Sequence, residues 1–143
     1  MPQVAPVALD ERGLTTDYVR GAISSHLAPL HFRNQLKILS EYFPSFKDMS
    51  ETTWPGLQIQ DLTGGGLISD DPLQLMARDE DFVAEIAAMG HGLQMWLQTM
   101  WFLARSMEVS TVILDEPDVY MHPDIQRRLI RYIKNKFHQI NKR

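Results

Sequence analysis

Two adjacent carboxylates, Asp115 and Glu116, directly follow the apolar residues 112–114 and precede Pro117. A continuous Val/Ile/Leu run predicts a buried parallel strand over residues 110–115, with both acids at the sheet edge where α/β proteins bind ligands. Because neighbouring strand residues point to opposite faces, one carboxylate can hold hydrated Mg²⁺ while the other orients or deprotonates an attacking water. The alternative is a strand that ends in a solvated acidic turn, since Asp and Pro are common turn residues.

A second candidate site lies upstream, where Gly90, His91 and Gly92 precede an apolar helical pattern that runs to about Ser106. Backbone amides at a glycine-rich helix start favour anions, because free N–H groups and the helix dipole point the same way. The alternative is a glycine bend that opens a core helix. Side chains from Gln94 onward are apolar nearly all round, which is typical of a helix buried in a core.

The order and spacing of the glycine loop and the carboxylates carry more information than either motif alone. The glycine loop, the apolar helix, a short break and the strand with its carboxylates span residues 90–116, and His122-Pro123 and Gln126 follow. This arrangement resembles the OLD/RecF/SMC-like branch of the ABC-type ATPases, which are also described as AAA-type ATP-binding proteins. The resemblance is specific over roughly residues 85–135. It implies that the glycine loop is the signature motif and that residues 110–115 form the Walker B strand.

The resemblance also implies a role for each candidate residue. Asp115 is expected to hold Mg²⁺, and Glu116 is expected to serve the attacking water as the catalytic residue. ATP and Mg²⁺ are the implied cofactors, with ATP contacted by Gly90, His91, Gly92 and Asp118. In the family the signature loop contacts the γ-phosphate held by the opposite subunit. Gly92 matches the glycine that the family needs most, whereas Gly90 stands where the family usually has Ser.

The sequence contains no Gly-x-x-x-x-Gly-Lys-[Ser/Thr], and none of its eight glycines is followed by Lys. The P-loop, its Lys and its Mg²⁺-binding hydroxyl are therefore missing. Only 27 residues follow Glu116, and the family's switch histidine is not expected among them, since His122 lies too close to the carboxylates. We expect the C-terminal part of a larger ATPase, inactive alone, that self-associates or needs a P-loop-bearing segment or subunit.

The fold class that follows is α/β, a partial P-loop NTPase sheet of the ABC-ATPase kind with a helical N-terminal insertion. One partial ATPase domain over 1–143 is expected, with an extended lead-in and helices over 1–55 and the remaining elements over 56–143. Within that sheet, the strand 110–115 lacks neighbours and should expose apolar surface, to which Trp96, Trp101 and Phe102 are expected to add.

In the N-terminal half, a helical pattern begins after Thr15 or Thr16, is interrupted near Pro29 and is expected to end at Pro44. Gln35 is interpreted as a surface residue rather than a nucleotide-contacting one. Strands are predicted over 56–63, 73–78 and 82–87. The glycines at 64–66 are interpreted as a hairpin connection, with a phosphate cradle as the alternative.

Composition excludes several classes of protein. The chain has no cysteine, which rules out a disulfide framework or thiolate zinc site, and no apolar run approaches the ~20 residues that span a bilayer. The start lacks a signal-peptide pattern, so the expected compartment is the cytoplasm, without membrane contact.

The basic residues are unevenly placed along the chain. Residues 126–143 hold seven of the 14 Lys and Arg residues and no acid. This amphipathic segment after Pro123 predicts a helix with a solvated basic face or a nucleic-acid contact.

The sequence leaves four functions open. The first is an ABC-type ATPase fragment, and the second is a regulatory subunit without turnover that completes a partner's nucleotide site. The third is a metal-dependent hydrolase using Asp115, Glu116, Asp118 and His122, although Pro117 and Pro123 disfavour the helix that such ligation needs. The fourth is a nucleic-acid-binding module built on the basic C-terminal segment.

Overall fold

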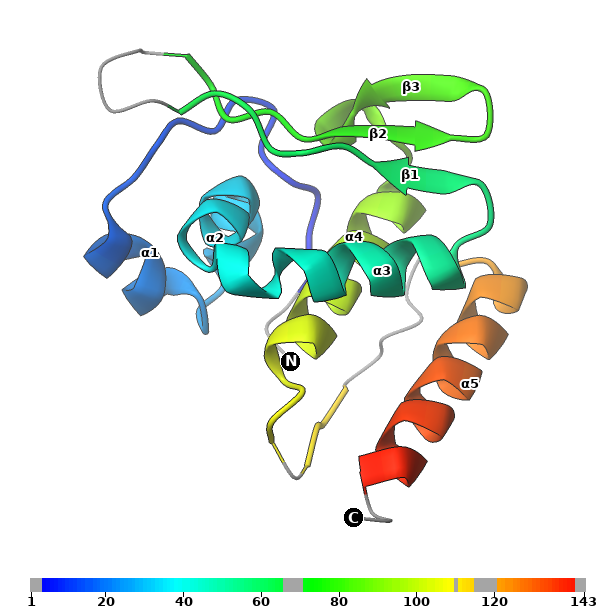
Figure 1. Cartoon of the computed structure of the whole chain (residues 1–143). Helices are drawn as coiled ribbons and strands as arrows, with labels where there is room; N and C mark the ends of the chain where they lie inside the picture. The colour runs from blue at the N-terminus through cyan, green and yellow to red at the C-terminus, as the bar shows by residue number, and fades with distance from the viewer. Residues whose placement is uncertain (1–3, 66–70, 110, 115–120, 141–143) are drawn as a thin grey trace.

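The computed structural model describes residues 4–65, 71–109, 111–114 and 121–140. Within the last range, it describes the side chains of residues 121–135 and the backbone alone of residues 136–140. Helices and one three-stranded antiparallel sheet form two layers, the sheet lying over α3 and the start of α4 (Figure 1). Residues 4–14 form no helix or strand, as the predicted extended lead-in requires. The chain is therefore a mixed α and β structure.

Three short helices follow the lead-in. They are α1 (Thr16–Ala22), α2 (Phe32–Ile38) and α3 (Phe43–Thr53), with 3₁₀ turns η1 (Ala28–His31) and η2 (Ser40–Tyr42) between them. Thr15 is the N-cap of α1, so the predicted start is confirmed. The expectation that Pro44 ends the helix was wrong, because Pro44 lies in the first turn of α3. A proline is tolerated there since that N–H has no helical acceptor.

The sheet consists of β1 (Leu57–Ile59), β2 (Met76–Asp79) and β3 (Phe82–Glu85), in the order β1-β2-β3. All three predicted strands exist but are shorter than predicted. An isolated bridge joins Thr63 to Gln74, so Gly64 and Gly65 lie in a hairpin connection, as predicted. Gly64 has φ of 81°, and a Cβ there would lie 2.0 Å from the carbonyl oxygen of Pro72. Only glycine fits this turn.

The core is organised around α4 (His91–Arg105), which confirms the predicted helix. Trp96 and Trp101 are 0% and 2% exposed, so the expectation that they add to an exposed apolar surface was wrong. Aromatic residues from α3 and its flanks cover them. The Trp101 ring lies 5.8 Å from that of Phe46, edge to face, and Trp96 lies 6.2 Å from Trp54. Phe102 is half-buried against the same cluster.

The interpretation of Gln35 as a surface residue was also wrong. Its side chain is 3% exposed and lies inside the core rather than on the surface. The oxygen accepts the indole N–H of Trp101 at 2.9 Å, and the nitrogen donates to the carbonyl of Ala28 at 2.7 Å. Because both ends of the amide are used, Gln35 ties α2 to α4 and to η1, and it has no free group for a nucleotide.

The prediction of a parallel strand over residues 110–115 was wrong for residues 111–114, the part of that range that the structure describes. Residues 111–114 form no strand, and the described sheet is entirely antiparallel. A strand is defined by hydrogen bonds to a neighbour, and no described strand pairs with this segment. After it, α5 (Pro123–Ile140) begins at Pro123, which confirms the predicted helix and its first-turn proline.

Candidate functional site: the start of helix α4

The start of α4 exposes backbone amides. Gly90 is its N-cap, with φ of −59° and ψ of 145°, and its carbonyl accepts the N–H groups of Leu93 and Gln94 at 3.0 and 3.2 Å. No described residue accepts the N–H of His91 or Gly92, as expected in a first helical turn. Gly90 and His91 are exposed, and a Cβ at Gly90 would meet no atom within 4 Å. This arrangement suits an anion.

A buried ion-pair network fixes the turn that leads into this loop. Glu85 accepts the N–H of Ala87 at 2.7 Å and caps η3 (Ile86–Ala88). Both of its carboxylate oxygens accept the guanidinium of Arg33, at 2.8 and 2.6 Å. Arg33 is fully buried and also lies 3.3 Å from the carboxylate of Glu11. Residues far apart in the sequence therefore hold one end of the glycine loop.

Gln94 also holds the residues that precede the loop. Its nitrogen donates to the carbonyls of Met89 at 2.8 Å and Ala87 at 3.2 Å, and its oxygen accepts the N–H of Val7 at 2.9 Å. The apolar pattern of the helix does not reveal this role of Gln94. The available signal was its spacing from Gln98, because two glutamines four apart share one face of an otherwise apolar helix.

The predicted catalytic, metal-binding and nucleotide-binding acids, Asp115, Glu116 and Asp118, lie outside the described residues. His122 is described and exposed, with its Nδ1 3.9 Å from the carboxylate of Asp124, which also pairs with Arg127 at 2.8 Å. Within the described part of the chain, no three His, Asp or Glu side chains are placed to hold a metal ion. Of the predicted site, the structure therefore places Gly90, His91 and Gly92.

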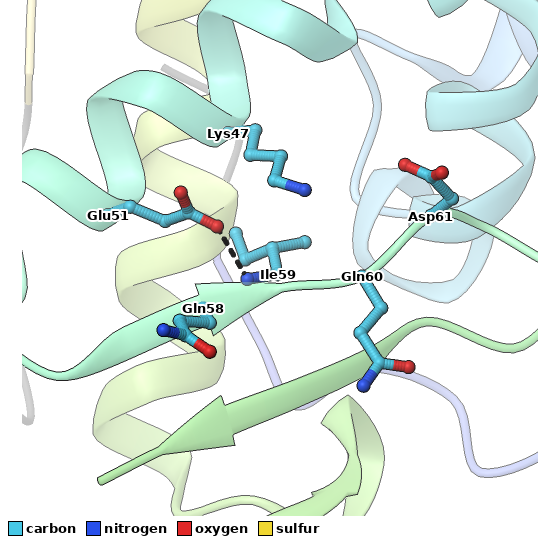
Figure 2. Close-up of a pocket in the computed structure, with 6 residues that line it drawn as sticks. All are labelled: Lys47, Glu51, Gln58, Ile59, Gln60 and Asp61. Atoms are coloured by element: carbon cyan, nitrogen blue, oxygen red, sulfur yellow. Dashed lines mark hydrogen bonds between the residues drawn. The ribbon is translucent and has the colours of Figure 1, made fainter.

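An open groove of about 490 Å³ lies between α3 and β1 (Figure 2), and none of the predicted site residues lines it. Glu51 in this groove accepts the N–H of Ile59 at 2.7 Å. The lining holds one cation, Lys47, against the carboxylates of Glu51 and Asp61. Excess negative charge disfavours the phosphates of a nucleotide, so the start of α4 remains the better candidate.

The outward side of α5 is basic. Arg128, Arg131 and Lys134 are exposed and recur at a spacing of three, which places them along one stripe of the helix. On its inner side Tyr132 is half-buried, and burial, with a smaller contribution from the charge of Asp48, raises the pKa of Tyr132 to about 12. Its hydroxyl stays protonated at neutral pH, so the inner side of α5 adds no negative charge.

Comparison with known proteins gives one family. The model described as "AAA domain, putative AbiEii toxin, Type IV TA system" matches residues 9–141. The chain belongs to this AAA-domain family. No curated protein and no solved structure matches it. Membership identifies a nucleotide-binding AAA-type domain and agrees with ATPase activity in general. In the part of the chain that is described, no helix is both long enough and apolar enough to cross a bilayer.

Proposed function

We propose that this AAA domain contributes the signature loop and the Walker B carboxylates to a composite ATP site of the ABC type. In this site, Gly90, His91 and Gly92 contact the terminal phosphate of an ATP held by a P-loop outside these 143 residues. Asp115 binds Mg²⁺, Glu116 activates the attacking water, and Asp118 contacts the nucleotide. ATP and Mg²⁺ supply the reacting phosphoryl group and the charge that neutralises it.

The observation that carries this proposal is the exposed start of α4. Two adjacent N–H groups without a described acceptor stand at the positive end of a 15-residue helix, and no side chain caps them. Such a turn stabilises a negative charge by about 0.3–1 kcal/mol at a surface and by more when partly buried. The family match over residues 9–141 indicates a nucleotide-binding domain, and the phosphates of a nucleotide carry such a charge.

The partner in this proposal is a P-loop-bearing segment or subunit, or a second copy of the assembly. Supporting evidence comes from the segment before the carboxylates. Val109 and Ile113 are 46% and 74% exposed, and Val112 and Leu114 are only partly buried. Exposed apolar side chains in this segment favour association, because covering them with a partner removes apolar surface from water.

The 143-residue chain alone is expected to hydrolyse ATP at background rate, because positioning and charge neutralisation by the P-loop supply most of phosphoryl-transfer catalysis. Mg²⁺-dependent phosphate release measures this, with Glu116→Gln as the matched control. Sedimentation over a concentration series should show self-association, or binding to an added P-loop-bearing segment. Brisk hydrolysis that Glu116→Gln abolishes, from a monomer at every concentration, would overturn the proposal of a composite site.

A second candidate function, contact with nucleic acid, is favoured by the basic stripe on α5. If Arg128, Arg131 and Lys134 each neutralise a phosphate, replacing all three with Ala should reduce the slope of log K against log salt by about three for duplex DNA. Fluorescence anisotropy of a labelled duplex at several salt concentrations measures the slope. The matched control replaces three exposed cations elsewhere, Arg12, Arg20 and Arg78, and equal slopes for both triple variants would reject a dedicated surface.

A further inference from the structure

Two glutamines of α4 bond to the N-terminal segment in a similar way but differ at the loop. Gln94 and Gln98 are 2% and 8% exposed in an otherwise apolar helix. Gln98 bonds to the N–H and carbonyl of Ala5, at 3.5 and 2.6 Å, and to the carbonyl of Gln94. Gln94 bonds to the N–H of Val7 and, unlike Gln98, to two carbonyls of the turn that precedes α4.

The bond from Gln94 to Met89 fixes the orientation of a peptide group. A trans peptide is planar, so its carbonyl and its N–H point in opposite directions. The carbonyl of Met89 points inward to the buried Nε2 of Gln94, at 2.8 Å. The N–H of the same peptide belongs to Gly90, and it is therefore directed away from the buried side chain of Gln94. No described residue accepts this N–H either.

We propose that Gln94 is a positioning residue for the glycine loop, one that holds the Met89–Gly90 peptide so that Gly90 donates its N–H to the bound phosphate. This inference rests on the proposed ATP site. Without Gln94 the inward carbonyl loses its partner, and a buried carbonyl without a hydrogen bond carries a desolvation cost. A flip of the peptide would relieve that cost.

The first test uses the chain alone and needs no ATPase activity. In Gln94→Met, the backbone ¹⁵N and ¹³C NMR shifts of Met89 and Gly90 are expected to move from their wild-type values, because the hydrogen bond to the carbonyl is lost. In Gln98→Met, which keeps the bonds to the loop, they are expected to stay. Equal changes in both variants, or none in Gln94→Met, would overturn the inference.

A second variant, Gln94→Glu, keeps the test valid if Gln94→Met fails to fold. Glutamate has the size of glutamine, and its carboxylate can still accept the N–H of Val7. Burial raises the pKa of a carboxyl, and only its protonated form can donate to Met89. As the pH falls through that raised pKa, the Gly90 shifts should return toward wild type, whereas Gln98→Glu should show no such return. A Gly90 signal independent of pH in Gln94→Glu would contradict the positioning role.

The second test measures turnover in the assembly that includes the P-loop. Gln94→Met is expected to lower kcat about tenfold with KM for ATP unchanged, because a misdirected donor weakens transition-state stabilisation while the P-loop still binds ATP. Gln98→Met should keep the wild-type kcat. If Gly92→Asp abolishes turnover and Gln94→Met does not lower it, the inference fails and the proposed function stands. If Gly92→Asp has no effect, the proposed function itself fails.

Discussion

Replacing Glu116 with Gln is expected to lower ATP turnover by about 10²- to 10⁴-fold in an assembly that includes the P-loop, because this is the usual contribution of a general base. The amide keeps the size of the carboxylate but cannot accept the proton of the attacking water. ATP and Mg²⁺ should therefore still bind, and the assembly should accumulate in its nucleotide-bound form. Phosphate release under single-turnover conditions and size-exclusion chromatography with ATP measure the two effects.

Asp115→Ala provides the contrasting variant. A residue that holds Mg²⁺ acts on binding as well as on chemistry, because the metal bridges the phosphates and neutralises their charge. We expect weaker Mg²⁺-dependent ATP binding and no accumulation of a nucleotide-bound assembly. If both variants showed the same binding defect and neither accumulated that state, the division of roles between the two carboxylates would be refuted.

The sequence predicted the elements whose cause is local. Helix α4 follows from a largely apolar pattern that begins at a glycine-rich turn, and α5 follows from Pro123 and a recurring apolar spacing. The hairpin at Gly64 and Gly65 follows from glycines that can adopt positive φ. Each of these signals depends on residues within a few positions of one another. The start of α4 was therefore predictable as an exposed glycine loop.

Features that depend on distant partners were not predictable. The burial of Gln35 requires Trp101, which lies 66 residues further along the chain, and the position of Gln94 at the loop requires Val7. The strand expected near residue 112 needs a neighbouring strand, and a sequence run cannot supply one. Pro44 was misplaced because a proline fits both the position after a helix and its first turn, and the following residues decide between them.

Gly92→Asp is expected to abolish ATP turnover in the assembly while leaving the fold of the chain largely intact. The substitution places an anion in the first turn of α4, next to the proposed γ-phosphate position, and two negative charges 4 Å apart repel by about 4 kcal/mol at an effective dielectric of 20. In the absence of nucleotide the same carboxylate suits the positive end of the helix. Thermal unfolding of the chain should therefore change little while phosphate release is lost.

Gly90→Ser is the matched control for this variant. Its backbone angles are open to any residue, and a Cβ there meets no atom within 4 Å, so the substitution fits without displacement. A serine N-cap stabilises a helix by a few tenths of a kcal/mol relative to glycine. Turnover should be retained, since the hydroxyl stands where the resembled family carries one. Wild-type turnover in Gly92→Asp would leave Gly90 and Gly92 with no role beyond the bend that starts α4.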